Sequence, residues 1–152
     1  RMGVRMFLNK DYQQFNYFGR GPMENYSDRK SGSEIGVYNS TVLQQLTPYE
    51  KPMECGNHED VRWAKLLNNT GNGLEVKSNS SLLQVSALPY SDEELAPVEY
   101  KIDLPASKAT VLCVDYKTLG VGSNSCGPTP MPEYCVYAEP TSFVYELKLV
   151  GK

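Results

Sequence analysis

The sequence has a single histidine, a single tryptophan and no Cys-x-x-Cys pair, and these shortages limit the chemistry available to the chain. His58 stands three positions after Cys55, but a zinc site needs further His or Cys ligands nearby, so the sequence predicts no metal site and no cofactor. The four cysteines are irregularly spaced, and free thiols are favoured over disulfides for a chain of this length. Cys113 lies in an apolar run and is expected to be a small core residue.

Charge and hydropathy weaken the case for two other classes of protein. The formal net charge is −3, from 15 basic and 18 acidic residues, so the chain offers no footprint for nucleic acid or an anionic membrane. No apolar stretch approaches the roughly 20 residues that cross a bilayer. Because the sequence opens at Arg1 inside an expected strand, we expect a segment of a longer protein, with any targeting signal outside it. The compartment therefore stays open between cytoplasm and periplasm.

Apolar alternation predicts β-structure along most of the chain. Over residues 143–149 every second residue is apolar or aromatic, with Glu146 and Lys148 on the opposite face. Residues 110–116 are apolar on both faces, as in a central strand. Many short strands between turns rich in Gly and Pro predict an all-β fold, either an antiparallel β-sandwich or a barrel. Strands are expected near residues 3–8, 14–18, 35–46, 60–67, 73–78, 82–88, 99–104, 110–116, 134–138 and 143–149.

Helix is scarce in the predicted fold. Ser91 precedes a run of acids, so one short helix is expected at residues 91–95, ended by Pro97. A second single turn is expected over residues 24–29, because Pro22 suits the first position of a helix. No repeat or linker divides the chain, so residues 1–152 are expected to form one β-sandwich domain or a fragment of one.

The first motif, residues 17–29, reads Tyr-Phe-Gly-Arg-Gly-Pro-Met-Glu-Asn-Tyr-Ser-Asp-Arg and contains a dense polar cluster. Paired acids such as Glu24 and Asp28 are what glycoside hydrolysis requires. However, no general acid in an apolar pocket can be named among them. A salt-bridged polar turn, with Arg20 and Arg29 as its cations, is therefore favoured over an active site.

The second motif, residues 47–63, contains two prolines and is expected to be extended. His58 is weighed as an isolated general base, and a structural role is favoured. Glu54 and Glu59 are expected to hold a turn. Trp63, at the start of a strand, is expected in the core rather than as a platform for a sugar.

The third motif, residues 120–128, reads Gly-Val-Gly-Ser-Asn-Ser-Cys-Gly-Pro. It lacks the patterns of a phosphate-binding loop, and no helix is expected after it. We therefore interpret it as a Gly/Ser-rich loop, and loops of this kind on a rigid sheet often carry binding residues.

The three motifs, together with Ser-Ala-Leu-Pro-Tyr at residues 86–90, resemble the C-terminal, small-chain domain of the glycoside hydrolase family 2 β-galactosidases. The signatures are Gly-Arg-Gly-Pro-x-Glu-Asn-Tyr-x-Asp-Arg and Pro-Tyr-x-x-Pro-x-Glu-x-Gly-Asn-x-x-x-Val-Arg-Trp, and the segments occur in the family's order over essentially the whole chain. The resemblance implies a β-sandwich similar to the galactose mutarotase supersandwich. Because the family's domain is longer, this chain resembles its C-terminal portion, excised from a larger multidomain enzyme.

The resemblance also implies a function for the parent enzyme, which would hydrolyse terminal β-galactosides with retention, using a pair of glutamates in a separate catalytic barrel domain. This chain would hold no catalytic residue and would be inactive alone. It would pack on the barrel, its partner, and shape the rim of the pocket for the carbohydrate substrate. An oligomer would form through the parent.

By position alone, the substrate-binding residues would be Asn124, Ser125 and Cys126. The family's tryptophan is expected where Cys126 stands, and a cysteine cannot replace its stacking surface. Either another domain supplies an aromatic contact or the parent has another glycoside specificity.

Two other functions stay open. The chain contains 11 tyrosines, so a free-standing carbohydrate-binding β-sandwich with an aromatic platform is one alternative. An interaction module is the other, and it predicts a large exposed apolar patch.

Overall fold

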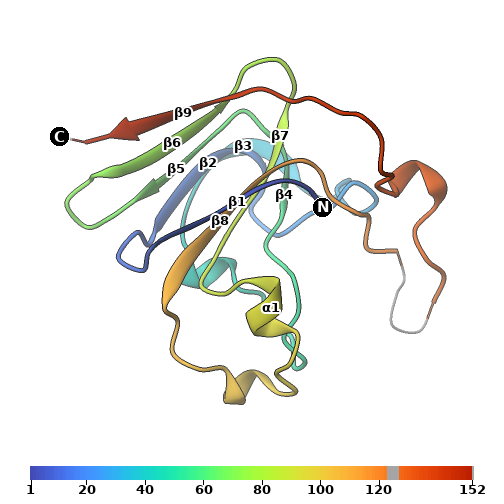
Figure 1. Cartoon of the computed structure of the whole chain (residues 1–152), viewed down its shortest axis with the longest axis horizontal. Helices are drawn as coiled ribbons and strands as arrows, with labels where there is room; N and C mark the ends of the chain where they lie inside the picture. Colours follow the sequence, from blue (N-terminus) through green and yellow to red (C-terminus); the bar gives the residue numbers. More distant parts are fainter. Residues whose placement is uncertain (123–126, 152) are drawn as a thin grey trace.

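The computed structural model describes residues 1–122 and 127–151, which form two antiparallel sheets (Figure 1). One sheet has the strand order β1-β8-β7-β4, and the other has the order β3-β2-β5-β6-β9. This arrangement confirms the predicted all-β antiparallel sandwich. The strands are β1 (Met2–Asn9), β2 (Gln14–Gly21), β3 (Glu34–Thr41), β4 (His58–Val61), β5 (Trp63–Leu67), β6 (Gly73–Ser78), β7 (Leu83–Leu88), β8 (Ala109–Lys117) and β9 (Tyr145–Val150).

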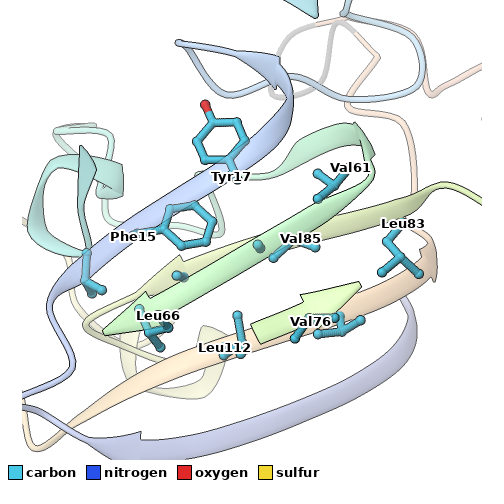
Figure 2. Packing of buried hydrophobic residues seen from close by; sticks show 12 residues of the cluster. Phe15, Tyr17, Val61, Leu66, Val76, Leu83, Val85 and Leu112 are labelled. Carbon is cyan, nitrogen blue, oxygen red and sulfur yellow. The ribbon is translucent and has the colours of Figure 1, made fainter. Parts of the chain in front are cut away.

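The core lies between the two sheets and is built from alternate residues of each strand (Figure 2). In β2, Phe15 and Tyr17 point inward and are fully buried, while Asn16 between them points outward. They meet Val85 of β7 and Leu112 of β8 in one continuous cluster. β8 lies between two strands and is buried on both faces from residue 110 to 115, as predicted for a central strand that includes Cys113.

The chain crosses from one sheet to the other within the predicted strand 60–67. β4 ends at Val61 and pairs with β7, whereas β5 begins at Trp63 and pairs with β2. Asp60, just before the crossing, has a positive φ of 55°. The second motif therefore ends where the chain passes from one sheet to the other. The single strand predicted over residues 60–67 is in fact divided between β4 and β5.

The predicted helix at 91–95 is confirmed as α1 (Asp92–Leu95). The side chain of Ser91 accepts a hydrogen bond from the backbone of Glu94, whose carboxylate accepts one in return from the backbone N–H of Ser91. Leu95 is buried beneath this turn. No helix among the described residues is long and apolar enough to cross a membrane.

The second predicted helical turn, over residues 24–29, is wrong. Tyr26 and Arg29 exchange two backbone hydrogen bonds as an isolated β-bridge. The backbone N–H of Asn25 is bonded to the carbonyl oxygen of Asn57, outside this segment. The Gly21–Pro22 peptide bond is cis.

Two predicted strands are also wrong, and a third is shortened. Residues 99–104 hold the 3-10 turn η2 (Lys101–Asp103), with the backbone of Lys101 bonded to Glu50, and residues 134–138 follow the turn η3 (Pro132–Tyr134). Prolines at positions 97, 105, 132 and 140 flank the two segments, and since proline supplies no N–H to a sheet, a strand in either place could not extend past them. The strand expected over 35–46 ends at Thr41, and the turn η1 (Leu43–Gln45) follows it.

The last strand, β9, pairs with β6 at the edge of its sheet. Phe143, just before this strand, and Tyr145 pack against the core, so the predicted alternation is kept only at its beginning. Leu147 and Leu149 are 46% and 87% exposed, because nothing among the described residues covers the far end of this strand.

Candidate functional site

The first two motifs are joined by a pair of buried asparagines. Asn25 donates its backbone N–H to the carbonyl oxygen of Asn57 at 2.7 Å, and the Asn57 side chain donates to the carbonyl oxygen of Asn25 at 2.8 Å. The side-chain oxygen of Asn25 accepts the backbone N–H of Glu59 at 2.8 Å, and its nitrogen donates to the carbonyl oxygens of Arg20 and Met23. We call this exchange the asparagine junction. It makes the two motifs one structural unit.

Charged side chains surround the asparagine junction. Arg20 Nε lies 2.5 Å from Asp60 Oδ2, and its Nη1 donates to the carbonyl oxygen of Ser33 at 2.8 Å. Lys30 Nζ lies 3.6 Å from Glu59 and 3.7 Å from Asp60. Burial raises the pKa of Glu59, and the nearby Lys30 opposes this. The result is the salt-bridged polar turn favoured from the sequence.

Glu24 is also fully engaged. Its carboxylate accepts the backbone N–H of Gly56 at 2.7 Å, an Arg29 N–H at 2.8 Å and the hydroxyl of Tyr49. Burial acts to raise the pKa of Glu24, but these hydrogen bonds outweigh burial and hold the pKa below its usual value. A carboxylate held in its ionised form is unsuited to serve as the general acid of a glycosidase.

His58 is buried at the start of β4 and has no access to a substrate. Its Nδ1 lies 2.9 Å from the carbonyl oxygen of Arg20, its Nε2 lies 2.5 Å from the Gln45 side chain, and its ring lies 4.1 Å from that of Tyr17. Burial lowers the pKa of His58 to about 4, so the imidazole is neutral at neutral pH. The histidine therefore has the structural role that was favoured, since it reaches no solvent.

Asp28 connects the first motif to the beginning of the third. Its Oδ1 accepts the backbone N–H of Val121 at 3.0 Å, and its Oδ2 accepts the backbone N–H of Gly122 at 2.7 Å. The same stretch is held from another direction, since Gly120 donates its N–H to the carbonyl oxygen of Tyr134 at 2.9 Å. This link could not be predicted from local sequence patterns, because its partners are more than 90 positions apart. The paired glycines of the third motif were its only local signal.

A cavity of about 370 Å³ is lined on one side by residues 118–121, which together with Gly122 form what we call the 118–122 segment. Its other walls are Arg1, Tyr26, Met53 and Glu54. The hydroxyl of Thr118 is buried and has no hydrogen-bond partner among the described residues. The cavity combines an apolar wall with charged and hydroxyl groups, a composition that suits a polar ligand or a loop of another domain.

Arg1 sits between two acids at this cavity. Its guanidinium lies 3.3 Å from Asp115 Oδ2 and also forms an ion pair with Glu54. Burial raises the pKa of Asp115 to about 6, although the Arg1 charge opposes the change. Glu54 therefore forms an ion pair with Arg1 at the cavity, a contact that its predicted role of holding a turn did not include.

Trp63 is not in the core, which corrects the expectation from the sequence. It is half-buried on the outer face of its sheet, where it pairs across strands with Phe18. The Lys65 ammonium lies 5.5 Å from the centre of the indole ring. The core positions of β5 belong to Ala64 and Leu66.

The substrate-binding residues expected by position, Asn124, Ser125 and Cys126, lie outside the described residues. Among those described, no group of three or more His, Cys, Asp or Glu could hold a metal ion. Cys55, Cys113 and Cys135 are free thiols.

Comparison with known proteins identifies the family of this chain. The family described as "Beta galactosidase small chain" matches residues 1–149. A β-galactosidase of Priestia megaterium is 39% identical over 90% of this chain and 13% of its own length, and one of Actinobacillus pleuropneumoniae is 38% identical over 88% and 13%. Beta-galactosidase BgaC of Bifidobacterium adolescentis is 34% identical over 97% of this chain and 14% of its own length. The chain thus spans about an eighth of these relatives and belongs to the β-galactosidase small-chain family.

Proposed function

We propose that this chain is a non-catalytic domain of a retaining β-galactosidase, which packs on a catalytic barrel and forms part of the wall of its substrate pocket. The family match over residues 1–149 and the relatives named β-galactosidases support the parent activity. The share of about 13% that the chain covers in those relatives leaves ample length for a catalytic domain elsewhere.

The engagement of the acids in the first motif carries the non-catalytic part of the proposal. A retaining glycosidase needs two carboxyl groups about 5–5.5 Å apart across the scissile bond, one of them protonated and both facing the sugar. Glu24 is ionised and holds Gly56, Arg29 and Tyr49. Asp28 holds two backbone N–H groups. Neither acid is available for proton transfer or attack on a sugar.

The substrate wall would comprise the 118–122 segment together with Asn124, Ser125 and Cys126, and the substrate would be a terminal β-galactoside. The 118–122 segment borders a cavity with charged and hydroxyl groups, which is consistent with a position at a polar pocket. An oligomer would form through the parent enzyme.

The test compares the isolated chain with the full-length polypeptide that contains it, using a nitrophenyl β-galactoside. The full-length protein should release nitrophenol, and the isolated chain, shown to be folded by circular dichroism, should release none above the buffer rate. Turnover by the isolated chain would refute the non-catalytic role. A full-length protein that hydrolyses another nitrophenyl glycoside instead would refute the galactoside specificity.

Trp63 favours a second candidate, a carbohydrate-binding surface. The indole and Phe18 are neighbours on the outer face of the sheet, and flat aromatic groups of this kind stack on sugars. Because Trp63 is the only tryptophan, its fluorescence reports directly on binding at this face. A saturable change with millimolar galactose or lactose, lost in Phe18→Ser, which keeps the tryptophan reporter, would support this candidate, and an unchanged wild-type spectrum would refute it.

A further inference from the structure

We propose that Asp28 is a positioning residue for the substrate pocket: its carboxylate sets the place and orientation of the 118–122 segment, and so governs substrate affinity without touching the substrate. The proposal rests on the proposed function, since it assumes that this segment borders the pocket. It assigns to the first motif a task that its sequence, as a cluster of acids and arginines, does not suggest.

The contact is made by both oxygens of one carboxylate to two consecutive backbone N–H groups. Oδ1 accepts from Val121 at 3.0 Å and Oδ2 accepts from Gly122 at 2.7 Å. Two bonds from one rigid, charged group fix a direction as well as a distance, and hydrogen bonds to an ionised acceptor are stronger than neutral ones. Arg29, the adjacent residue, pairs with Glu24. The two acids of the first motif thus have different partners.

The 118–122 segment is shaped to receive this carboxylate. A Cβ at Gly120 would lie 2.7 Å from Asp28 Oδ2 and 2.9 Å from Cβ of Tyr134, so a side chain there would push the two apart. Gly122 has a φ of +59°, a conformation that residues with a side chain rarely adopt. Close approach therefore explains Gly120 and backbone conformation explains Gly122, and phosphate binding is not needed to account for these two glycines.

Asp28 is itself held on a rigid base. Tyr26 and Arg29 close a tight turn around it with two backbone hydrogen bonds, of 3.2 Å and 2.8 Å. Asn25, one residue further back, is the centre of the buried asparagine junction. Asp28 therefore ties the 118–122 segment to the buried asparagine junction, and residues 123–126 follow this segment directly in the sequence.

The experiment uses the full-length enzyme and the substitution Asp28→Asn, which keeps the size of the side chain but turns one acceptor into a donor that faces a backbone N–H. The matched control is Asp11→Asn, the same change at an exposed residue far from this contact in the sequence. We expect Asp28→Asn to raise KM for a nitrophenyl β-galactoside about tenfold with kcat within about twofold, because a misplaced pocket wall weakens binding of substrate and transition state alike. Asp11→Asn should match the wild type.

Gly120→Ala disturbs the contact between Asp28 and the 118–122 segment from the side of the segment, and it keeps the Asp28 carboxylate unchanged. It should raise KM in the same direction, and it decides the matter should Asp28→Asn yield no folded enzyme. A purely structural role predicts another pattern, in which melting temperature and the amount of active enzyme fall while KM stays unchanged. That pattern, or kinetic constants equal to those of Asp11→Asn and the wild type, would overturn the proposal. A wild-type enzyme without turnover would instead refute the proposed function on which it rests.

Discussion

Replacing His58 by glutamine should change how the stability of the chain depends on pH. The imidazole is fully buried between Arg20, Gln45 and the ring of Tyr17, and burial lowers its pKa from 6.5 to about 4, with the charge of Glu24 opposing the change. Glutamine does not titrate, and its amide can still donate to the carbonyl oxygen that His58 meets. The substitution therefore removes one proton-binding site and keeps a polar side chain.

The magnitude follows from the two pKa values. In the unfolded chain the histidine binds a proton below pH 6.5, whereas in the folded chain it does so only near pH 4. Because the pKa of His58 is lower in the folded chain, the histidine stabilises the fold at pH values above the pKa of the unfolded chain. This stability is lost as the pH falls towards the pKa of the folded chain. Since one pH unit corresponds to about 1.4 kcal/mol, the wild type should lose about 3 kcal/mol between pH 7 and pH 4 through His58 alone.

Asp115 acts with the opposite sign over part of the same window. Burial raises its pKa from 3.8 to about 6, so the folded chain binds a proton where the unfolded chain does not, and stability rises as the pH falls from about 6 to about 4. Between pH 6 and pH 4 this gain is about 2 kcal/mol. Between pH 6 and pH 4 the stability lost through His58 and the stability gained through Asp115 nearly cancel. The free energy of unfolding of the wild type therefore shows neither contribution.

The measurement is urea unfolding followed by Trp63 fluorescence at pH 7, 6, 5 and 4. From pH 7 to pH 4 the free energy of unfolding of His58→Gln should rise by about 3 kcal/mol relative to that of the wild type. Asp115→Asn is the control of opposite sign, because it should lose ground to the wild type as the pH falls. A difference between His58→Gln and the wild type that stays constant to within about 1 kcal/mol would show that the folded histidine titrates normally, and the reasoning from burial would be refuted.

Three further predictions concern the fold. Leu66→Ala should lower the free energy of unfolding by about 2–5 kcal/mol in urea titrations, because this fully buried side chain has neighbours from both sheets; a loss below about 1 kcal/mol would contradict its place in the core. Ser91→Ala should cost about 1 kcal/mol in the same assay by removing the cap of α1, whereas an unchanged midpoint would argue against the capping box. In a Cys126→Ser background, a thiol reagent should modify Cys135 well before Cys55, because burial raises the pKa of Cys55 to about 11; equal rates would contradict that burial.

Elements with strong local signals could be predicted from the sequence. The alternation in β2 and the doubly apolar run of β8 report directly on burial, and the Ser91 cap with its acids identifies α1. The predictions fail where a distant partner decides the local conformation. The backbone of Asn25 bonds to Asn57, and that of Lys101 bonds to Glu50, so neither segment adopts the structure its own residues favour.

The candidate site was predictable only in part, for the same reason. The first motif could be interpreted as a polar anchor, because its acids and arginines can satisfy one another within a short segment. What it anchors could not be inferred, since the contact of Asp28 with residues 121 and 122 depends on how β8 and its following loop return to the start of the chain. The expectation that Trp63 lies in the core failed because Ala64 and Leu66 hold the inward positions of β5, and adjacent residues of a strand point to opposite faces.

The exposed position of β9 gives the domain a gradient of local stability. All its hydrogen-bonded pairing is with β6, and none of its residues is buried, so its release would leave the cluster around Phe15, Leu66 and Leu112 covered on both sides. Opening of this strand is therefore a separate event of low free energy, distinct from global unfolding. In native-state hydrogen exchange the amides of β9 would exchange long before those of β2, and a free strand edge on β6 would be presented during each opening.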